Sequence, residues 1–503
     1  MNVVFRVDAS VQIGIGHVMR CLTLAKSLKR HKVTVKFICR KHHGNLIDEI
    51  KLQGFEVFEL KFLDTCDIDR SSNYSHWLGV TQQQDSNECV DFFQFKEIDW
   101  MVIDHYSIDE VWQKELKPYY KNLMVIDDLA NRKHLCDILL DQTFGRNKNE
   151  YTKLVPKFCK LLLGSYYSLL RPEFENWRGF SLNRRKNFKF NNILVSMGGI
   201  DSDNITEKIL DSIACCDLPD NIGITVVMGK MSPNIESVKR KSYALRYKVK
   251  IKIGVDNMAE IMSKSDIAIG ASGSTTWERC CLGLPTIQIS IAENQEHIVK
   301  NLNDVKVVKI IKDVSQLKDS IPAVIKSSVK MSLASSSIVN GEGVNKVVNF
   351  IFFKDKYADL FSIRPAREND SDFVYRTQTK ETRKYYLNPE VPTIGKHTKW
   401  FLYIMSSLTS QLFIITFGHQ NAGVLRVDNI KHNEISVSIA ILSNYRGKGI
   451  ARIALLDLEK LIPGRVLKAT IHKDNLFSNN LFLKLGYKII KYNENFVEYI
   501  KHC

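Results

Sequence analysis

The first residue with the chemistry of a catalyst is a histidine on a glycine-containing turn. The segment Gly14-Ile15-Gly16-His17-Val18-Met19-Arg20 directly follows a predicted strand and opens a predicted helix. Glycines let a backbone approach a ligand, and free N–H groups at a helix N-terminus attract an anion. Histidine exchanges its proton near neutral pH, so we expect His17 to act in acid–base catalysis, with Gly16 and Arg20 at the substrate. The alternative is a structural or capping histidine.

Polar residues follow two further predicted strands. Asp104-His105-Tyr106 comes after the strand at residues 100–103, and Asp127-Asp128 comes after the strand at 123–126. Ligands bind at the carboxyl ends of parallel strands, so these side chains can reach a substrate. Asp104 and Asp127 could equally cap the helices that follow them. We place Asp104 and Tyr106 in the predicted site.

Similar turns recur in the middle of the chain. Ser196-Met197-Gly198-Gly199 ends one predicted strand, and 270–278 joins another strand to a helix. Small and hydroxyl side chains at such a turn can bind a diphosphate, and Glu278, one helical turn later, can bind a ribose diol. The alternative for Glu278 is a solvated helix charge. The expected substrate-binding residues of this part are Gly198, Gly199, Ser274, Thr275, Glu278, Asn294 and Gln295.

The elements that would carry these residues alternate between strands and helices from residue 1 to 353. Strands are predicted at 3–7, 33–38, 100–103 and 123–126, and again at 193–196, 224–227, 249–253, 267–269 and 286–289. Helices, among them 17–29, 46–52 and 108–116, lie between them. This α/β alternation predicts two Rossmann-like lobes with parallel sheets, at about 1–180 and 190–353. Residues 161–191 are predicted as a basic, aromatic linker, and 328–353 as a polar loop and a closing helix.

From residue 361 the pattern changes. Strands at 412–417, 423–427 and 435–441 precede a helix from Gly449 and a last strand at 467–471. Successive strands ahead of a late helix predict a mixed α+β domain over 361–503, with the boundary near 354–360.

Composition limits the class of protein. The chain has 503 residues, 44% hydrophobic and 25% charged, which suits two or three folded units. Its net charge of +16 is spread along the chain, so we expect an anionic small substrate and no nucleic acid. The eleven cysteines show neither zinc spacing nor a disulfide framework, and no metal is predicted. Because no apolar stretch has membrane length and residues 1–6 read as a strand, we expect a cytoplasmic protein without a membrane partner.

In combination, the motifs of residues 1–353 resemble those of a known family. They are Gly16-His17-xx-Arg20, His76-Trp77-Leu78-Gly79-Val80, Asp104-His105-Tyr106, Ile126-Asp127-Asp128-Leu129-Ala130, Leu139-Leu140-Asp141-Gln142, Leu169-Leu170-Arg171-Pro172-Glu173-Phe174, Met197-Gly198-Gly199, Ser274-Thr275-Thr276-Trp277-Glu278 and Glu293-Asn294-Gln295. The family is that of the UDP-2,4-diacetamido-2,4,6-trideoxy-β-L-altropyranose hydrolases of pseudaminic acid biosynthesis, relatives of the two-lobed GT-B glycosyltransferases.

The resemblance implies a UDP-sugar substrate from which water displaces UDP at the anomeric carbon. It assigns His17 as the catalytic histidine, Tyr106 to the neighbourhood of the sugar, and Glu278 as the nucleotide-binding acid. Without a metal motif, basic side chains and backbone amides would stabilise the departing diphosphate.

A basic loop and two later segments resemble the GCN5-related N-acetyltransferases (GNAT). The loop is Tyr445-Arg446-Gly447-Lys448-Gly449-Ile450-Ala451, and the later segments are 471–478 and 482–487. The resemblance implies a GNAT fold and an acetyl-CoA co-substrate whose pyrophosphate is held by loop amides. The expected cofactor-binding residues are Arg446, Gly447, Lys448, Gly449, Ile450, Ala451 and Asn475. The alternative is a basic glycine loop without function.

The chain departs from this second family at one position. Many members carry a tyrosine acid where this chain has Phe482, which has no ionisable proton. A different acid or solvent must then protonate the leaving thiolate. Glu434 is a candidate base acting through water.

The two resemblances together predict a bifunctional enzyme. In pseudaminic acid synthesis, acetylation of the 4-amino group of a UDP-sugar immediately precedes removal of UDP, so the C-terminal domain would make the substrate of residues 1–353. One alternative is a GT-B glycosyltransferase that passes the sugar to an alcohol. Another is a nucleotide-sugar-binding protein with a lysine acetyltransferase domain. His17 argues against a binding-only role, and the pathway argues against a lysine target. The oligomeric state is left open.

Overall fold

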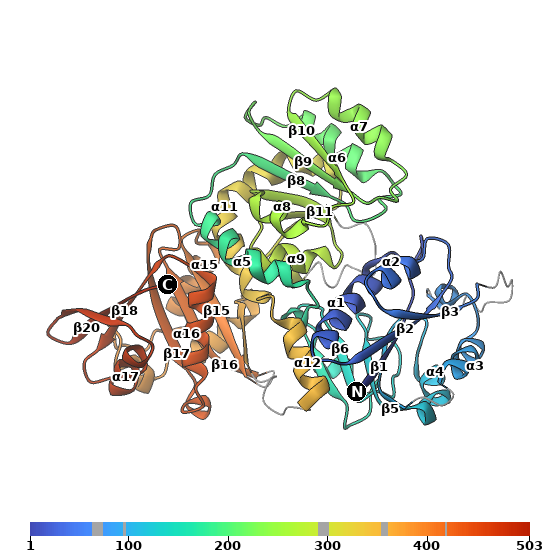
Figure 1. The fold of residues 1–503 in the computed structure, drawn as a ribbon. Coiled ribbons are helices and arrows are strands. Elements are labelled where there is room, and N and C mark those ends of the chain that lie inside the picture. The colour runs from blue at the N-terminus through green and yellow to red at the C-terminus, as the bar shows by residue number, and fades with distance from the viewer. Residues whose placement is uncertain (63–73, 94–96, 290–300, 354–360, 418–419) are drawn as a thin grey trace. The chain divides into compact units, whose positions relative to one another are not determined.

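A computed structural model describes residues 1–62, 74–93, 97–289, 301–353, 361–417 and 420–503 (Figure 1). The chain forms two compact units. The first comprises Met1–Arg171 with Gly341–Asp355, and the second comprises Pro172–Asn340 with Lys356–Cys503. The second unit therefore contains both the second α/β lobe and the C-terminal domain.

The first unit is built on seven parallel strands in the order β3-β2-β1-β4-β5-β6-β7. Successive apolar side chains of these strands point to opposite faces of the sheet, so both faces are apolar, as expected for a parallel sheet that is covered on both sides. On one face, Val4, Met101 and Ile103 pack with Phe92 and Trp112 of two covering helices. The strands are β1 (Asn2–Val7), β2 (Thr34–Arg40), β3 (Glu56–Leu60), β4 (Ile98–Asp104), β5 (Tyr120–Ile126), β6 (Ile138–Asp141) and β7 (Lys160–Leu163). The helices are α1 (Gly16–Arg30), α2 (Ile47–Leu52), α3 (Gln82–Phe93), α4 (Glu110–Glu115) and α12 (Gly343–Phe353).

The second lobe repeats this plan with six parallel strands in the order β10-β9-β8-β11-β12-β13. The strands are β8 (Asn192–Ser196), β9 (Gly223–Met228), β10 (Lys248–Ile253), β11 (Ile267–Ala271), β12 (Thr286–Ile289) and β13 (Lys309–Ile311). Its helices are α5 (Pro172–Arg185), α6 (Ile205–Ala214), α7 (Ile235–Tyr243), α8 (Met258–Lys264), α9 (Thr275–Cys281) and α11 (Leu317–Ile338). The predicted strands of both lobes are confirmed, and the two parallel sheets have the GT-B arrangement of two Rossmann-like lobes.

Two local predictions in this part are wrong. The linker predicted over 161–191 contains the helix α5, and the polar loop predicted from residue 328 is the second half of α11. The serines of α11 fit a buried helix because their hydroxyls donate to carbonyls three residues earlier. Ser335, Ser336 and Ser337 do so at 3.1, 3.2 and 2.7 Å. The closing helix is confirmed as α12.

The C-terminal domain is a mixed seven-stranded sheet in the order β14-β15-β16-β17-β18-β20-β19. Its strands are β14 (Phe361–Pro365), β15 (Ser410–Phe417), β16 (Gln420–Asp428), β17 (Glu434–Ile441), β18 (Val466–His472), β19 (Lys488–Tyr492) and β20 (Phe496–His502). Its helices are α13 (Ser371–Arg376), α14 (Lys380–Arg383), α15 (Ile394–Ser406), α16 (Ile450–Leu461) and α17 (Leu476–Lys484). The strand predicted as the last, β18, is followed by two more, and β20 pairs with it along its whole length.

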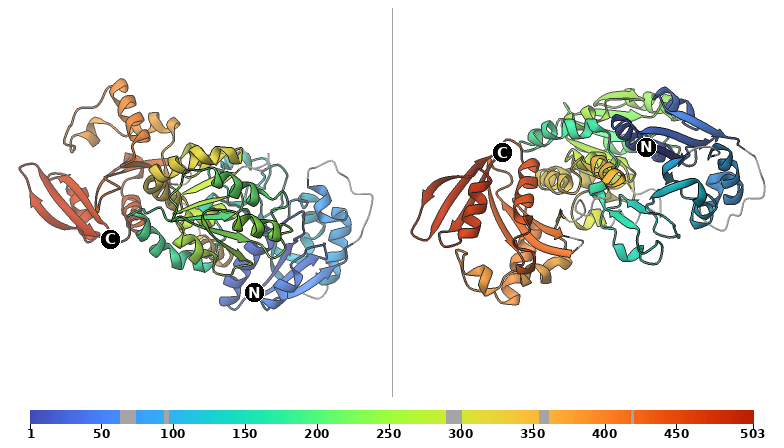
Figure 2. Two further views of the ribbon diagram at one scale, coloured as in Figure 1. Left: turned by 90° about the horizontal axis from the view of Figure 1, so that it is seen from above. Right: turned by 60° about the horizontal axis from the view of Figure 1, so that its bottom comes forward.

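One helix of the second unit lies between its two sheets. In Figures 1 and 2, α11, drawn in yellow, runs between the green sheet of the second lobe and the orange-to-red sheet of the C-terminal domain. Ile321 and Met331 of α11 belong to the apolar core of the second lobe, whereas Leu333 belongs to the core of the C-terminal domain. The helix therefore contributes to two cores.

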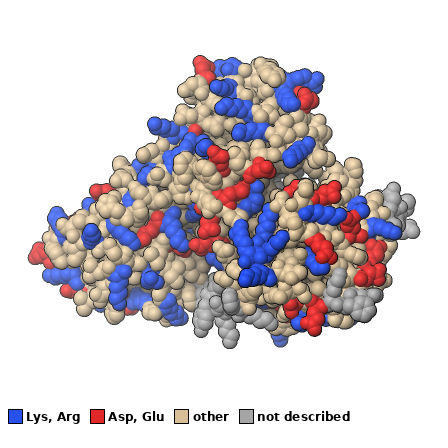
Figure 3. Space-filling model, in the orientation of Figure 1, with Lys and Arg blue, Asp and Glu red and all other residues tan. Residues whose placement is uncertain are grey.

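The surface charge is mixed on the face that Figure 3 shows. Lysine and arginine side chains are interspersed with acidic ones there. Within the residues that the structure describes, no helix is both long and apolar enough to span a bilayer. In the same residues, no cluster of three or more His, Cys, Asp or Glu side chains is arranged to hold a metal.

Candidate active sites

The order of the first sheet explains where its polar residues meet. Strands β1 and β4 are neighbours, although β2 and β3 come between them in the sequence and lie on the other side of β1. This is the topological switch point of the sheet, where the connections after the two strands diverge and leave a crevice. His17 lies in the first turn of α1, which follows β1, and β4 ends at Asp104.

His17 and Asp104 form a buried hydrogen-bonded pair. The Nδ1 atom of His17 lies 2.6 Å from Oδ1 of Asp104. Burial alone would raise the pKa of Asp104, but the charges of Arg20 and His17 outweigh it and hold the pKa well below its usual range. Because an ionised carboxylate only accepts hydrogen bonds, Nδ1 carries a proton in this pair, and in the neutral imidazole Nε2 presents a lone pair. This arrangement makes Nε2 a suitable general base.

Arg20 and Tyr106 complete a network around this pair. Arg20 donates through Nε to Oδ2 of Asp104 at 2.6 Å and through a terminal nitrogen to Oδ2 of Asp128 at 2.6 Å. The hydroxyl of Tyr106 donates to the same Asp128 oxygen at 3.1 Å. Burial, with the charge of Asp128, raises the pKa of Tyr106 well above its usual value, so the hydroxyl stays protonated. The guanidinium of Arg20 is thus occupied in fixing two carboxylates.

An aromatic wall borders His17. The ring of Tyr106 meets the imidazole edge-on, with centroids 4.7 Å apart, and Trp77 stacks on Tyr106 at 5.5 Å. Trp77 lies on a short 3₁₀ helix, Ser75–Leu78. Apolar aromatic faces next to a catalytic base suit the carbon face of a sugar ring and keep the number of competing waters low.

Asp8 is a residue of this region that the sequence analysis missed. It follows β1 directly, is almost fully buried, and accepts from Arg6 at 2.7 Å and from the backbone N–H of Arg40 at 2.7 Å. Nε2 of His105 lies 3.3 Å from its second oxygen. The rule that selected Asp104, a polar residue at the carboxyl end of a strand, applies equally to Asp8. Its partners lie on β1, on β2 and just after β4, so Asp8 links the ends of three strands.

We expect Asp104→Asn to reduce UDP release by roughly 10²–10⁴-fold, as when the orienting acid of a histidine base is neutralised. The asparagine amide can donate to Nδ1, which moves the imidazole proton to Nε2 and removes the base. Steady-state rates for the variant and for Asp99→Asn check this, because Asp99 lies at the exposed opposite end of the same strand. Wild-type rates in Asp104→Asn would contradict the role.

The predicted turns of the second lobe also meet at a switch point. Strands β8 and β11 are neighbours, with Gly270 opposite Ser196 in the ladder. This brings Gly198 and Gly199 to the same edge as Ser274 and Thr275. Gly198 has φ 102°, and a Cβ there would meet open space. Glu278 is half-buried in the first turn of α9, and Asn294 and Gln295 lie outside the described residues.

In the predicted coenzyme loop of the C-terminal domain, no neighbouring atoms crowd the two glycines. Gly447 and Gly449 both have φ 76°, in the left-handed region that favours glycine, and a Cβ on either would touch nothing. Gly449 is the N-cap of α16, and Arg446 is tied to the carbonyl of Ile441 at 3.0 Å and to Glu381 at 2.6 Å. The loop exposes Gly447, Lys448 and Gly449 just before Ile450 and Ala451. Amides so placed suit a pyrophosphate.

Two parallel strands separate next to this loop. Strands β17 and β18 pair only from Glu434–Ser436 to Val466–Lys468, and beyond that the ladder stops while each strand continues. Asn475 caps α17 just after β18, through a bond from the N–H of Ser478 at 3.2 Å. The gap opens toward the loop and offers unpaired backbone groups to an extended ligand that carries amides.

Glu434 begins β17 at the closed, paired end, whereas the coenzyme loop follows Ile441 at the other end. Seven residues of strand at about 3.3 Å each place it roughly 23 Å from the loop. Its carboxylate is exposed and pairs with Lys468 at 3.6 Å. Its role as a base acting through water stays a prediction.

Phe482 lies in the core of the domain rather than at a surface. Its ring packs edge-on against Tyr487 at 4.8 Å and lies 6.2 Å from Tyr499. The Tyr499 hydroxyl donates to Asn479 at 2.7 Å. Phe482 therefore supports α17 and supplies no proton.

The chain matches two domain families. Residues 192–347 match the glycosyltransferase family 28 C-terminal domain, and residues 361–488 match the acetyltransferase (GNAT) domain. The UDP-2,4-diacetamido-2,4,6-trideoxy-β-L-altropyranose hydrolase of Campylobacter jejuni is 29% identical over 298 residues, which cover 59% of this chain and 94% of that protein. The chain thus joins a region homologous to this hydrolase to a GNAT domain.

Two further likenesses extend over more of the chain. An uncharacterised protein of Methanocaldococcus jannaschii is 26% identical over 512 aligned positions, covering 98% of this chain and 97% of that protein. MurG of Acinetobacter baumannii superposes with a TM-score of 0.53 at 13% identity, over 70% of this chain and 99% of that chain. The likeness to MurG shows the GT-B fold alone. Together the findings support a sugar-nucleotide-processing enzyme with a GNAT acetyltransferase domain.

Proposed function

We propose that the protein catalyses two successive steps on one UDP-sugar. The C-terminal domain acetylates the 4-amino group of a UDP-4-amino-trideoxy-altrose derivative, using acetyl-CoA. Residues 1–353 then hydrolyse the resulting UDP-2,4-diacetamido-2,4,6-trideoxy-β-L-altropyranose. The observation that carries this proposal is the His17–Asp104 pair at the switch point of the first sheet, in a chain homologous to such a hydrolase.

In the hydrolytic step, Nε2 of His17 takes a proton from water. The water oxygen forms a bond to the anomeric carbon while the bond from that carbon to the diphosphate oxygen breaks, and UDP leaves with the electron pair. Asp104 stabilises the imidazolium that forms. Because the charge of Arg20 is neutralised by two carboxylates, backbone amides and other basic side chains stabilise the departing diphosphate.

In the acetylation step, acetyl-CoA supplies a thioester whose carbonyl carbon accepts the substrate amine. The exposed loop with two glycines at φ 76° fits its pyrophosphate, and the gap between β17 and β18 fits its amide-bearing arm. The amine nitrogen forms a bond to the carbonyl carbon while the bond from carbon to sulfur breaks, and the nitrogen then gives up a proton, for which Glu434 acting through water is the candidate base. Phe482 has no ionisable proton, so a different acid or solvent protonates the departing thiolate.

We expect Glu278→Ala to raise KM for the UDP-sugar about 10–100-fold with little change in kcat. A ribose contact forms in both the ground state and the transition state, so its loss weakens binding more than chemistry. Loss of a hydrogen bond to a charged group, about 1.5–3 kcal/mol, sets the size. Steady-state kinetics check this against Glu236→Ala, an exposed acid of α7 that pairs with Lys239. A lower kcat at unchanged KM would count against the role.

Water labelled with heavy oxygen tests the hydrolytic half. The proposal expects UDP release without any added alcohol, with the label in the free sugar and none in UDP. Label in UDP would mean that a phosphorus–oxygen bond breaks instead. UDP release that requires an added acceptor would favour the glycosyltransferase.

A further inference from the structure

The helix α11 shares its side chains between the second lobe and the C-terminal domain. Ile321, Val324 and Met331 pack into the core of the second lobe. Leu333, two residues beyond Met331, is buried in the core of the C-terminal domain, and Val329 packs against that core. A helix between two domains that are merely tethered would present a polar face to solvent. From Lys330 to Ile338, every residue of α11 is buried.

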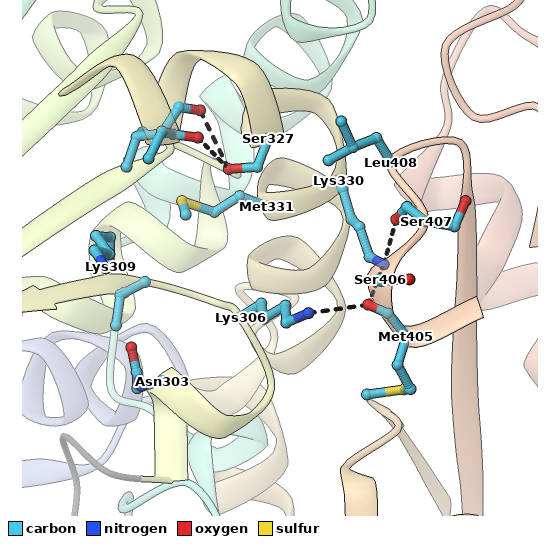
Figure 4. Close-up of a pocket in the computed structure, with 13 residues that line it drawn as sticks. Asn303, Lys306, Lys309, Ser327, Lys330, Met331, Met405, Ser406, Ser407 and Leu408 are labelled. Atoms are coloured by element: carbon cyan, nitrogen blue, oxygen red, sulfur yellow. Dashed lines mark hydrogen bonds between the residues drawn. The ribbon is translucent and has the colours of Figure 1, made fainter. Parts of the chain in front are cut away.

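Two lysines of the second lobe cap a helix of the C-terminal domain. Lys330 donates through Nζ to the carbonyls of Ile404, Met405 and Ser407, at 3.3, 3.0 and 2.5 Å. Lys306 donates to the same Met405 carbonyl at 3.0 Å (Figure 4). These carbonyls belong to the last turn of α15 and to its C-cap residue Ser407, where the negative end of the helix dipole lies. The Ile404 carbonyl also accepts from the backbone N–H of Ser407 at 3.2 Å, so the lysines add donors to a helix end that the domain caps only in part.

The buried lysine is costly unless these acceptors are present. Burial, with the charge of Lys306, lowers the pKa of Lys330 to about 8. A buried ammonium without hydrogen-bond acceptors would be strongly destabilising. The buried lysine and the carbonyls that it binds thus stabilise each other.

We call Lys306 and Lys330, with the carbonyls that they bind, the lysine clamp. A cavity of about 330 Å³, lined by Lys309 and Ser327 among others, lies beside it.

A second group of contacts joins the second lobe to the C-terminal domain. Lys186, just after α5, donates to the carbonyl of Gly464 at 3.0 Å. Arg465 is 6% exposed and donates to the carbonyl of Ile430. The cavity between Leu182, Leu333 and Leu461 holds only about 20 Å³, the room of about one water. The second lobe and the C-terminal domain thus leave little space between these leucines.

We propose that the second lobe and the acetyltransferase domain form a single stable body, held by this interface rather than by the peptide that joins them. The partner surface of α11 is the chain's own C-terminal domain, which meets it with apolar side chains and with the C-terminal end of α15. The body also supports the predicted nucleotide turn. A Cβ on Gly283, just after α9, would lie 2.7 Å from Oγ of Ser332, so α9 and α11 touch there. This inference does not depend on which reactions the two sites catalyse.

The test cuts the connection in the full-length protein. A protease site replaces part of 354–360, the protein is cleaved to completion, and the fragments are analysed by size exclusion at micromolar and nanomolar concentration. The two fragments are expected to co-elute. Separation of the wild-type fragments at micromolar concentration would overturn the proposal.

A matched pair of variants tests the lysine clamp. Lys330→Met keeps an unbranched side chain but removes a donor shared by three carbonyls, of which Met405 keeps Lys306 and Ile404 keeps the N–H of Ser407. We expect the fragments of this variant to dissociate at least about tenfold more readily. Lys309→Met, at the rim of the same cavity, should dissociate like the wild type. Circular dichroism before cleavage confirms that both variants are folded. Equal dissociation constants for the two variants would refute the clamp.

Discussion

Replacing His17 by asparagine is expected to lower the rate of UDP release by roughly 10²–10⁴-fold, the usual contribution of a general base. The asparagine amide can still donate to Asp104 from near the position of Nδ1, which lies 2.6 Å from that carboxylate. The substitution thus removes Nε2 while preserving the bond that orients the side chain. Acetylation of the 4-amino sugar should continue at the wild-type rate, because His17 belongs to the first unit. Separate assays for UDP and for the acetylated sugar measure the two rates.

His31→Asn is the control for this result. His31 lies at the other end of the same helix, where it is exposed and its ring meets Phe352. It should release UDP like the wild type. Wild-type release by His17→Asn would show that another group activates the water.

Gly449→Val is expected to abolish acetylation while hydrolysis of pre-acetylated UDP-sugar continues. Gly449 has φ 76°, which a β-branched residue adopts only with strain of about 1–3 kcal/mol. The loop would relax to another conformation and its amides would turn away from the pyrophosphate. We expect KM for acetyl-CoA to rise about 10²-fold or more, measured by thiol release from coenzyme A.

Gly486→Val separates this effect from general backbone strain. Gly486 has φ 83° in the same domain, and a Cβ there also meets open space. Its substitution should lower the melting temperature by a similar amount but leave KM for acetyl-CoA unchanged. Equal losses of coenzyme binding in both variants would mean that the loop is not the pyrophosphate site. If Gly449→Val lost hydrolysis as well, the strain would extend through the shared body into the second lobe.

The candidate site of the first lobe could be predicted from the sequence because the order of strands in a parallel sheet determines which residues converge. In a parallel sheet, residues at strand ends converge at one edge, so His17 and Asp104 could be expected together from their positions after β1 and β4. The sequence could not show that His17 and Asp104 are hydrogen-bonded or that Arg20 binds both Asp104 and Asp128, because these contacts depend on the positions of side chains. Asp8 satisfied the same rule and was overlooked because no helix or glycine turn follows it at once.

Other features could not be read because they depend on distant parts of the chain. Residues 328–338 are rich in serine, which as a local pattern favours a loop, yet two domains bury them as a helix. Strand β20 is recognisable mainly through its ladder with β18. In each case tertiary packing outweighed the local signal.

The most direct test of the account supplies UDP-2-acetamido-4-amino-2,4,6-trideoxy-altrose to the protein, with and without acetyl-CoA, and follows the sugar and UDP together by mass spectrometry. With acetyl-CoA, the account predicts that the nucleotide sugar first gains one acetyl group, and that UDP and the free diacetamido sugar then appear together. Without acetyl-CoA, UDP release should be slow. Acetylation of added protein lysines in place of the sugar, or an acetylated UDP-sugar that accumulates without releasing UDP, would contradict the account.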